Sequence, residues 1–149
     1  MTYDLEKILP HKKPMILIDD IKEINMDEKY LISEFSINED KIFFDKSING
    51  VNYLAGIEFM AQTIGCYAFF KSKLEEPKLG FLLGTRLYKN KIEKFENGQK
   101  YNVKVNEIFC DNELVSFECL IYNIDGECAS AVINAFQPDN AEEYLKNGL

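Results

Sequence analysis

Residues 54–71 read LAGIEFMAQTIGCYAFFK, a stretch long enough for a helix of several turns. Its side chains are apolar on nearly every side of such a helix, so it has no polar face to turn to solvent and should be buried all round. Three small residues, Ala61, Gly65 and Ala68, would let neighbouring strands approach the helix closely. The rest of the chain must therefore pack around this helix and bury it.

The segment before this helix predicts one short helix and two strands. Residues 1–9 show the spacing of a short amphipathic helix, which Pro10 ends. Residues 15–18 predict the start of a buried strand, and residues 30–37 predict a second strand whose alternate side chains share one face. The polar, glycine-bearing residues 45–53 predict a loop.

The segment after the helix predicts four strands, separated by turn signals such as Asp125-Gly126. Alternation is cleanest in the third of them, where Val115, Phe117, Cys119 and Ile121 share one face. These strands are expected over residues 81–87, 101–109, 114–123 and 128–136.

The order of elements predicts one α+β domain over residues 1–149. A helix that is hydrophobic all round can be buried only if a curved antiparallel sheet wraps it, which is the hot-dog fold. A small sheet of this kind leaves strand edges unpaired, and pairing two copies would cover them. We therefore expect a dimer.

The composition excludes several classes of protein. The chain has 149 residues, a net charge of −8 and 46% apolar residues, as is typical of a globular domain. No apolar run approaches the roughly 18–20 residues that span a bilayer, and no secretory signal is visible. Because nucleic acid requires clustered basic residues, an acidic chain without them is not expected to bind it. We expect a cytoplasmic protein without nucleic-acid or membrane partners.

Metal and cofactor sites are not expected either. The four cysteines, Cys66, Cys110, Cys119 and Cys128, form no C-x-x-C pair, and His11 is the one histidine. Each cysteine lies in an apolar segment and is expected to be a small buried hydrophobe. No nucleotide or flavin motif is present, so we expect no cofactor.

Glu58 is the most informative polar residue, because it is a carboxylate near the start of an otherwise apolar helix. It could favour the helix N-terminus through the macrodipole, or it could be an acid or base in a dry pocket. Gln62 lies four residues on, on the same face. It could orient Glu58, bind substrate or have a structural role.

His11 is the second candidate, since it is the one imidazole of the chain. Pro10 and Pro14 stiffen the backbone on both sides of it, as a positioned catalytic group would require. A lone histidine is also compatible with a structural or simply exposed position.

Several sequence motifs of the chain together resemble those of a known family. The segment LPHKKPMILID, residues 9–19, resembles the N-terminal LPH-x-x-P segment of bacterial 3-hydroxyacyl-acyl-carrier-protein dehydratases, and residues 56–62, GIEFMAQ, resemble the E-x-M-A-Q motif of their central helix. The chain is more similar still to the aryl-polyene-cluster dehydratase-like subgroup. Residues 80–86, 117–119 and 134–138 carry that similarity.

The resemblance implies elimination of water from a 3-hydroxyacyl thioester to give a trans-2-enoyl thioester. In the family, a histidine removes the α-proton, and the helix carboxyl, here Glu58, protonates the leaving hydroxyl. Amides at the N-terminus of the helix polarise the thioester carbonyl. This implies Gly56 and Gln62 as substrate-binding residues.

One feature departs from the family. Its catalytic histidine lies between the second strand and the central helix, but residues 38–57 of this chain contain none. Asp45 and Asn49 lie in that loop, and neither is basic enough to remove the proton easily. Either His11 has taken the role, or the chain is inactive on its own.

Three hypotheses therefore remain: a dehydratase that uses His11 and Glu58, a thioesterase that uses Glu58 alone, and a non-catalytic or carrier-binding subunit of a heteromeric dehydratase. The expected ligand is an acyl thioester of acyl-carrier protein or CoA. The expected assembly is a homodimer or a hetero-oligomer with another hot-dog chain. An acidic carrier requires a local basic patch, for which the candidates are Lys71, Lys73, Lys78, Arg86, Lys89, Lys91 and Lys94.

Overall fold

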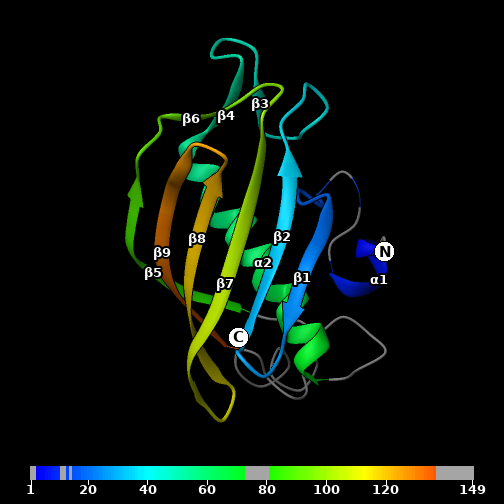
Figure 1. Ribbon diagram of the computed structural model, residues 1–149, viewed down its shortest axis with the longest axis vertical. Coiled ribbons are helices and arrows are strands. Elements are labelled where there is room, and N and C mark those ends of the chain that lie inside the picture. Colours follow the sequence, from blue (N-terminus) through cyan, green and yellow to red (C-terminus); the bar gives the residue numbers. More distant parts are fainter. Residues whose placement is uncertain (1–2, 11–12, 14, 73–80, 137–149) are drawn as a thin grey trace.

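A single antiparallel sheet of six strands dominates the computed structural model, which describes residues 3–10, 13, 15–72 and 81–136. The strands follow the order β1-β2-β7-β8-β9-β5, so β1 and β5 form the edges (Figure 1). Their bounds are β1 Asp20–Asn25, β2 Tyr30–Ser36, β5 Phe81–Asn90, β7 Lys100–Asp111, β8 Leu114–Asn123 and β9 Gly126–Phe136.

The central helix α2, Gly56–Ser72, lies across one face of this sheet (Figure 1). A 3-10 turn, η1 Tyr53–Ala55, leads directly into it, and the short helix α1, Leu5–Ile8, lies near the N-terminus. A second sheet of three short strands, β3 Phe44–Asp45, β4 Gly50–Asn52 and β6 Lys94–Glu96, lies at one end of the main sheet. An antiparallel sheet that packs against one long helix is the predicted hot-dog arrangement.

The alternating strands turn their apolar side chains toward α2, as the sequence predicts. In β8, the four residues predicted to share a face are all buried: Val115, Phe117, Cys119 and Ile121. In β2, buried and half-buried residues alternate along the whole strand. Because successive side chains of a strand point to opposite faces, this one-sided burial fixes the register of the sheet against the helix.

Aromatic rings connect the helix to the sheet near the start of α2. Phe59 stacks on Phe35 of β2 with ring centroids 3.8 Å apart, and Phe95 of β6 meets both rings edge-on. Buried aromatic side chains remove large apolar areas from water and prefer these geometries. They hold the first turns of α2, where the candidate site lies, in a fixed position on the sheet.

The helix is not buried all round, in contrast to the prediction. One stripe along it remains half-buried, and its members recur about every four residues, which places them on one face. The sheet and the N-terminal segment cover the other faces. The stripe consists of Ile57, Glu58, Ala61, Gly65, Phe69 and Ser72.

Three further predictions are corrected. The strand predicted from residue 15 begins only at Asp20, and residues 15–19 are extended without being part of the sheet. The predicted loop 45–53 contains strand β4, whose Val51 pairs with Phe95. Cys110 is exposed near the end of β7, whereas the other three cysteines are buried.

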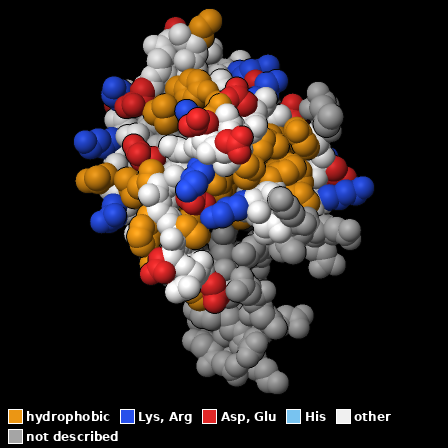
Figure 2. Space-filling view, turned by 60° about the horizontal axis from the view of Figure 1, so that its bottom comes forward, with side chains coloured by type: hydrophobic (Ala, Val, Ile, Leu, Met, Phe, Trp, Pro, Cys, Tyr) orange, Lys and Arg blue, Asp and Glu red, His pale blue; other side chains and the backbone are white. Residues whose placement is uncertain are grey.

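Hydrophobic side chains also reach the surface, where Figure 2 shows them gathered between charged groups on one face. Among the exposed large side chains are Leu54, beside the start of α2, and Leu87, on edge strand β5. Exposed apolar patches mark interaction surfaces more often than isolated exposed residues do. No helix within the described residues has the length and apolar character needed to cross a membrane.

Candidate functional site

The site forms around the start of α2, where several elements hold the first turn. Asn52 caps the 3-10 turn, since its side-chain oxygen accepts a hydrogen bond from the amide of Leu54, 2.9 Å away. The hydroxyl of Tyr88, from β5, donates to the carbonyl of Tyr53. Burial raises the pKa of Tyr88 to about 12, so this hydroxyl remains a donor at neutral pH.

Gly56 allows a close approach between this turn and β5. A Cβ atom at Gly56 would lie 2.3 Å from the Tyr88 hydroxyl oxygen and 3.3 Å from side-chain atoms of Phe95 and Ile121. Its amide donates to carbonyls of the preceding turn, including that of Tyr53. The geometry therefore gives Gly56 a packing role, and its role in substrate binding stays a prediction.

Glu58 lies in the first turn of α2, on the half-buried stripe. Its Oε1 atom accepts a hydrogen bond from Nε2 of Gln62, 3.2 Å away. The i,i+4 spacing read from the sequence thus becomes a direct contact between these side chains. Glu58 is a fixed carboxylate at a partly accessible position, which is what an acid–base group requires.

Gln62 is 1% exposed and makes two further hydrogen bonds to the backbone of the N-terminal segment. Its Oε1 accepts from the amide of Leu17 at 2.8 Å, and its Nε2 donates to the carbonyl of Met15 at 2.7 Å. Only this orientation of the amide satisfies both partners. The contacts favour the positioning role of Gln62 over direct substrate binding.

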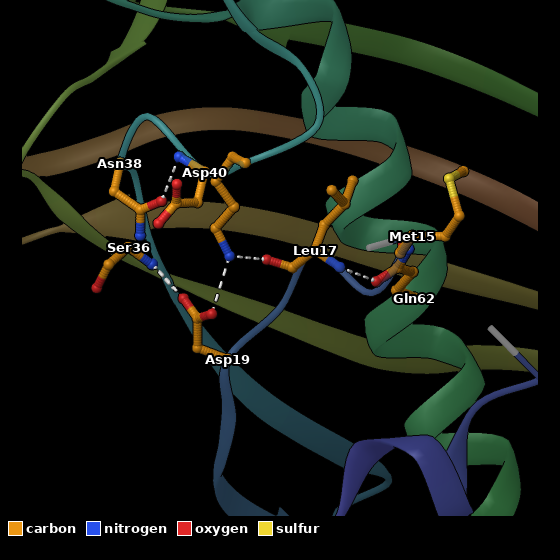
Figure 3. A network of polar contacts seen from close by, with 8 residues as sticks. Met15, Leu17, Asp19, Ser36, Asn38, Asp40 and Gln62 are labelled. Atoms are coloured by element: carbon orange, nitrogen blue, oxygen red, sulfur yellow. Dashed lines mark hydrogen bonds and ion pairs between the residues drawn. The ribbon is translucent and has the colours of Figure 1, made fainter. Parts of the chain in front are cut away.

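Residues 15–19 form an extended segment beside α2, which we call the strap (Figure 3). Gln62 holds its first half. Lys41, from the loop after β2, donates to the carbonyl of Leu17 and contacts Oδ1 of Asp19 at 2.9 Å. The amide of Asp19 donates to the carbonyl of Glu34 in β2 at 2.8 Å. The strap is thus held between the helix and the sheet.

The connector between α1 and the strap is anchored to α2 at both ends. At one end, Leu9 is fully buried, and its Cδ2 would lie 2.8 Å from a Cβ at Gly65. At the other, Met15 is bound to Gln62. These anchors lie about one helical turn apart on α2. His11 belongs to this connector but lies outside the described residues, so its predicted role stays a prediction.

Sequence reasoning missed Lys41 and Asp19, which secure the strap. Residues 15–18 have the composition of a buried strand, and nothing in the local pattern shows that they instead contact the helix. Lys41 lies in a polar turn, where a lysine is ordinarily solvated. A buried partner for it becomes visible only when the loop and the strap are brought together in space.

The described candidates for the predicted basic patch do not all lie on one surface. Lys71 binds Glu107 near the last turn of α2, whereas Lys94 donates to the carbonyl of Ile48 at 2.7 Å, near the first turn. The length of α2, roughly 25 Å, separates them. Lys91 pairs with Glu127 at 3.3 Å. Lys73 and Lys78 lie outside the described residues.

Within the described residues, no group of three or more His, Cys, Asp or Glu side chains could hold a metal ion. Two surface cavities, of about 440 and 530 Å³, open on strands of the main sheet and beside β6. Neither is lined by Glu58 or Gln62. The candidate site is therefore the half-buried face of α2 and not either of these cavities.

Comparison with known proteins gives matches over almost the whole chain. The family model described as ApeP-like, ApeP dehydratase, matches residues 3–146. A solved structure, the dehydratase heterocomplex ApeI:P from Xenorhabdus doucetiae, matches with a TM-score of 0.86 and 24% identity over 98% of this chain and 97% of that chain. At this identity the structural match shows the fold.

Curated relatives match over a shorter region. The 3-hydroxyacyl-[acyl-carrier-protein] dehydratase FabZ of Streptococcus agalactiae is 33% identical over 84 residues, which cover 54% of this chain and 58% of that protein. FabZ of Syntrophomonas wolfei is 36% identical over 87 residues, 56% of this chain and 58% of that protein. The chain thus spans less than two thirds of these relatives.

Fold similarity extends to thioesterases. A hypothetical thioesterase with coenzyme A from Streptococcus pneumoniae matches with a TM-score of 0.63 and 9% identity, over 80% of this chain and 84% of that chain. Such a likeness shows a shared hot-dog fold and no more.

The contact at Gly56 predicts an unusual response to alanine. In an ordinary helix Gly→Ala stabilises by about 0.5–1 kcal/mol, but at Gly56 we expect a loss of about 1–3 kcal/mol from overpacking. In the Tyr88→Phe background the loss should be smaller, because the obstructing oxygen is absent. Urea unfolding of the single and double variants measures this coupling.

Gly84→Ala is the matched control, since a Cβ there meets nothing within 4 Å. Equal costs of Gly56→Ala in the two backgrounds would show that Tyr88 does not limit the space at the start of α2.

Proposed function

Because the chain belongs to the ApeP-like dehydratase family, we propose that it takes part in the elimination of water from a 3-hydroxyacyl thioester to give a trans-2-enoyl thioester. The substrate would be carried by acyl-carrier protein or CoA. The curated relatives support this, since their names give a 3-hydroxyacyl-[acyl-carrier-protein] dehydratase.

The observation that carries the proposal is the placement of Glu58. It is a carboxylate on the half-buried face of an otherwise apolar helix, and Gln62 donates a hydrogen bond to one of its oxygens. Gln62 is itself fixed by two backbone contacts. A carboxyl held this firmly can meet a bound substrate without reorganising its surroundings.

In the proposed reaction, a base removes the proton from C2 of the acyl chain while the C3–O bond breaks. The electron pair of the C2–H bond becomes the C2=C3 double bond, and protonated Glu58 gives its proton to the departing hydroxyl, which leaves as water. General acid–base groups of this kind contribute roughly 10²–10⁴-fold each. After the step, the base carries the proton from C2 and Glu58 has lost its own. The base must release its proton and Glu58 must take one up before the next turnover.

We propose His11 as that base, since it is the one imidazole of the chain. Two facts about its neighbours support the choice. Leu9 and Met15, which flank the connector, are both anchored on α2 within about a turn of Gln62. The prolines on either side of His11 restrict the backbone between these anchors.

We further propose that a second hot-dog chain completes the site. The stripe of α2 stays only half-buried within the described chain, and β5 is an edge of the main sheet. Unpaired strand edges are commonly covered by association. That a solved structure of the same fold is a dehydratase heterocomplex supports a partner different from this chain.

Replacement of the proposed acid or base tests the mechanism. We expect Glu58→Gln and His11→Ala each to keep the fold and to lower the dehydration rate by at least about 10²-fold. Groups that act in one step are not additive, so the double variant should lose little more than either single variant. Formation of enoyl thioester from a 3-hydroxyacyl thioester is the measurement.

Glu39→Gln, at an exposed turn, is the matched carboxyl control and should keep full activity. Release of free thiol that requires Glu58 but not His11 would favour a thioesterase. Dehydration by the complete assembly that is indifferent to both residues would show that this chain is a non-catalytic subunit.

The assembly is tested by its mass in solution. We expect the purified chain at micromolar concentration, or the chain purified with a second hot-dog subunit, to run as a dimer or larger species, because β5 and the α2 stripe become covered. Multi-angle light scattering measures this. A monomeric mass under both conditions would contradict the proposed completion of the site by a second chain.

A further inference from the structure

Lys41 carries a charged group into a nearly buried position. Its side chain is 8% exposed, and its ammonium contacts the carbonyl of Leu17 and a carboxylate oxygen of Asp19, 2.9 Å away. Removal of an ammonium from water costs several kcal/mol unless partners replace the lost hydration. Both partners of Lys41 belong to the strap, so the strap provides the contacts that offset the cost of burying the ammonium.

The loop after β2 is built to place this lysine. The side-chain oxygen of Asn38 accepts from the amide of Asp40 at 2.9 Å, and the carbonyl of Asn38 accepts from the amide of Lys41 at 3.2 Å. The carbonyl of Lys41 then accepts from the amide of Phe44 at 2.9 Å. Consecutive turns therefore fix the backbone of Lys41, and its long side chain reaches Leu17 and Asp19 of the strap.

Lys41 and Gln62 hold the same residue of the strap from opposite sides. Gln62 accepts from the amide of Leu17, and Lys41 donates to its carbonyl. Asp19 adds a second connection, because its other carboxylate oxygen accepts from the amide of Ser36 in β2 at 2.7 Å. The contacts form one path from the β2 loop through the strap to Gln62 and then to Glu58.

A purely stabilising role does not require a cation at this position. Replacement of a buried ion pair by apolar residues of similar volume is often neutral or stabilising, so burial alone does not favour lysine. What an apolar side chain could not supply is a directed donor to the Leu17 carbonyl. An unpaired carbonyl there would leave the strap free to shift against Gln62.

We propose that Lys41 is a positioning residue for the dehydration: it fixes the strap, which fixes Gln62, which fixes the Glu58 carboxylate. This inference rests on the proposed function, because it assigns Lys41 a role through the candidate acid. Lys41 itself touches neither Glu58 nor the reacting atoms. Its loss therefore affects the geometry of proton transfer more than the binding of the thioester.

Lys41→Met tests the inference, because methionine keeps an unbranched apolar stem and removes the donor. In the complete assembly we expect kcat for dehydration to fall by about 10- to 100-fold, as is typical when a catalytic group is misplaced by about 1 Å, with KM changed less than threefold. Lys41→Arg, which keeps the charge and the donors, should recover at least part of kcat. Hydrogen exchange of the Leu17 amide reports on the strap directly and should accelerate in Lys41→Met.

Lys100→Met is the matched control, since Lys100 is 64% exposed and its ion pair with Glu34 spans 3.6 Å. It should change neither kcat nor the exchange of Leu17. A wild-type assembly that dehydrates, together with a folded Lys41→Met variant of unchanged kcat, would overturn the positioning role alone. Unchanged exchange of Leu17 would also overturn it, whatever the activity. A wild-type assembly without dehydration would overturn the proposed function and the positioning role together.

Discussion

The side-chain amide of Gln62 is the contact on which the candidate site depends. It is buried in the first half of α2 and bonds to Met15, Leu17 and Glu58 at once. A buried amide that lost these partners would leave several polar groups unsatisfied, at about 1–3 kcal/mol each. The arrangement is therefore stable only when helix, strap and carboxylate are all in place.

The fold supplies the rigid frame for this contact. Alternating strands bury one side of the sheet against α2, and stacked rings such as Phe35 and Phe59 fix the first turns of the helix. The same packing leaves the stripe with Glu58 half-buried. The chain belongs to a family described as ApeP-like dehydratases, and a dehydratase heterocomplex shares its fold.

The sequence was sufficient to predict structure where a pattern is local and repeats. Alternation in residues 114–123 predicted both the strand and its buried face, and the i,i+4 spacing of Glu58 and Gln62 predicted their contact. It was insufficient where partners come from distant segments. Lys41 and Leu17 are 24 positions apart, and the local sequence around neither residue indicates that the other is its partner. The composition of residues 15–18 predicts a strand, because a buried extended segment has the same composition whether its backbone hydrogen bonds go to a sheet or to a helix side chain.

A double-mutant cycle of Gln62→Leu and Glu58→Gln on dehydration by the complete assembly tests the central claim most directly. If Gln62 acts by holding the catalytic carboxyl, Gln62→Leu lowers kcat by at least about tenfold in the wild-type background and has little further effect once Glu58 is glutamine. Equal losses in both backgrounds, with folded protein throughout, would contradict the claim, because Gln62 would then act independently of Glu58.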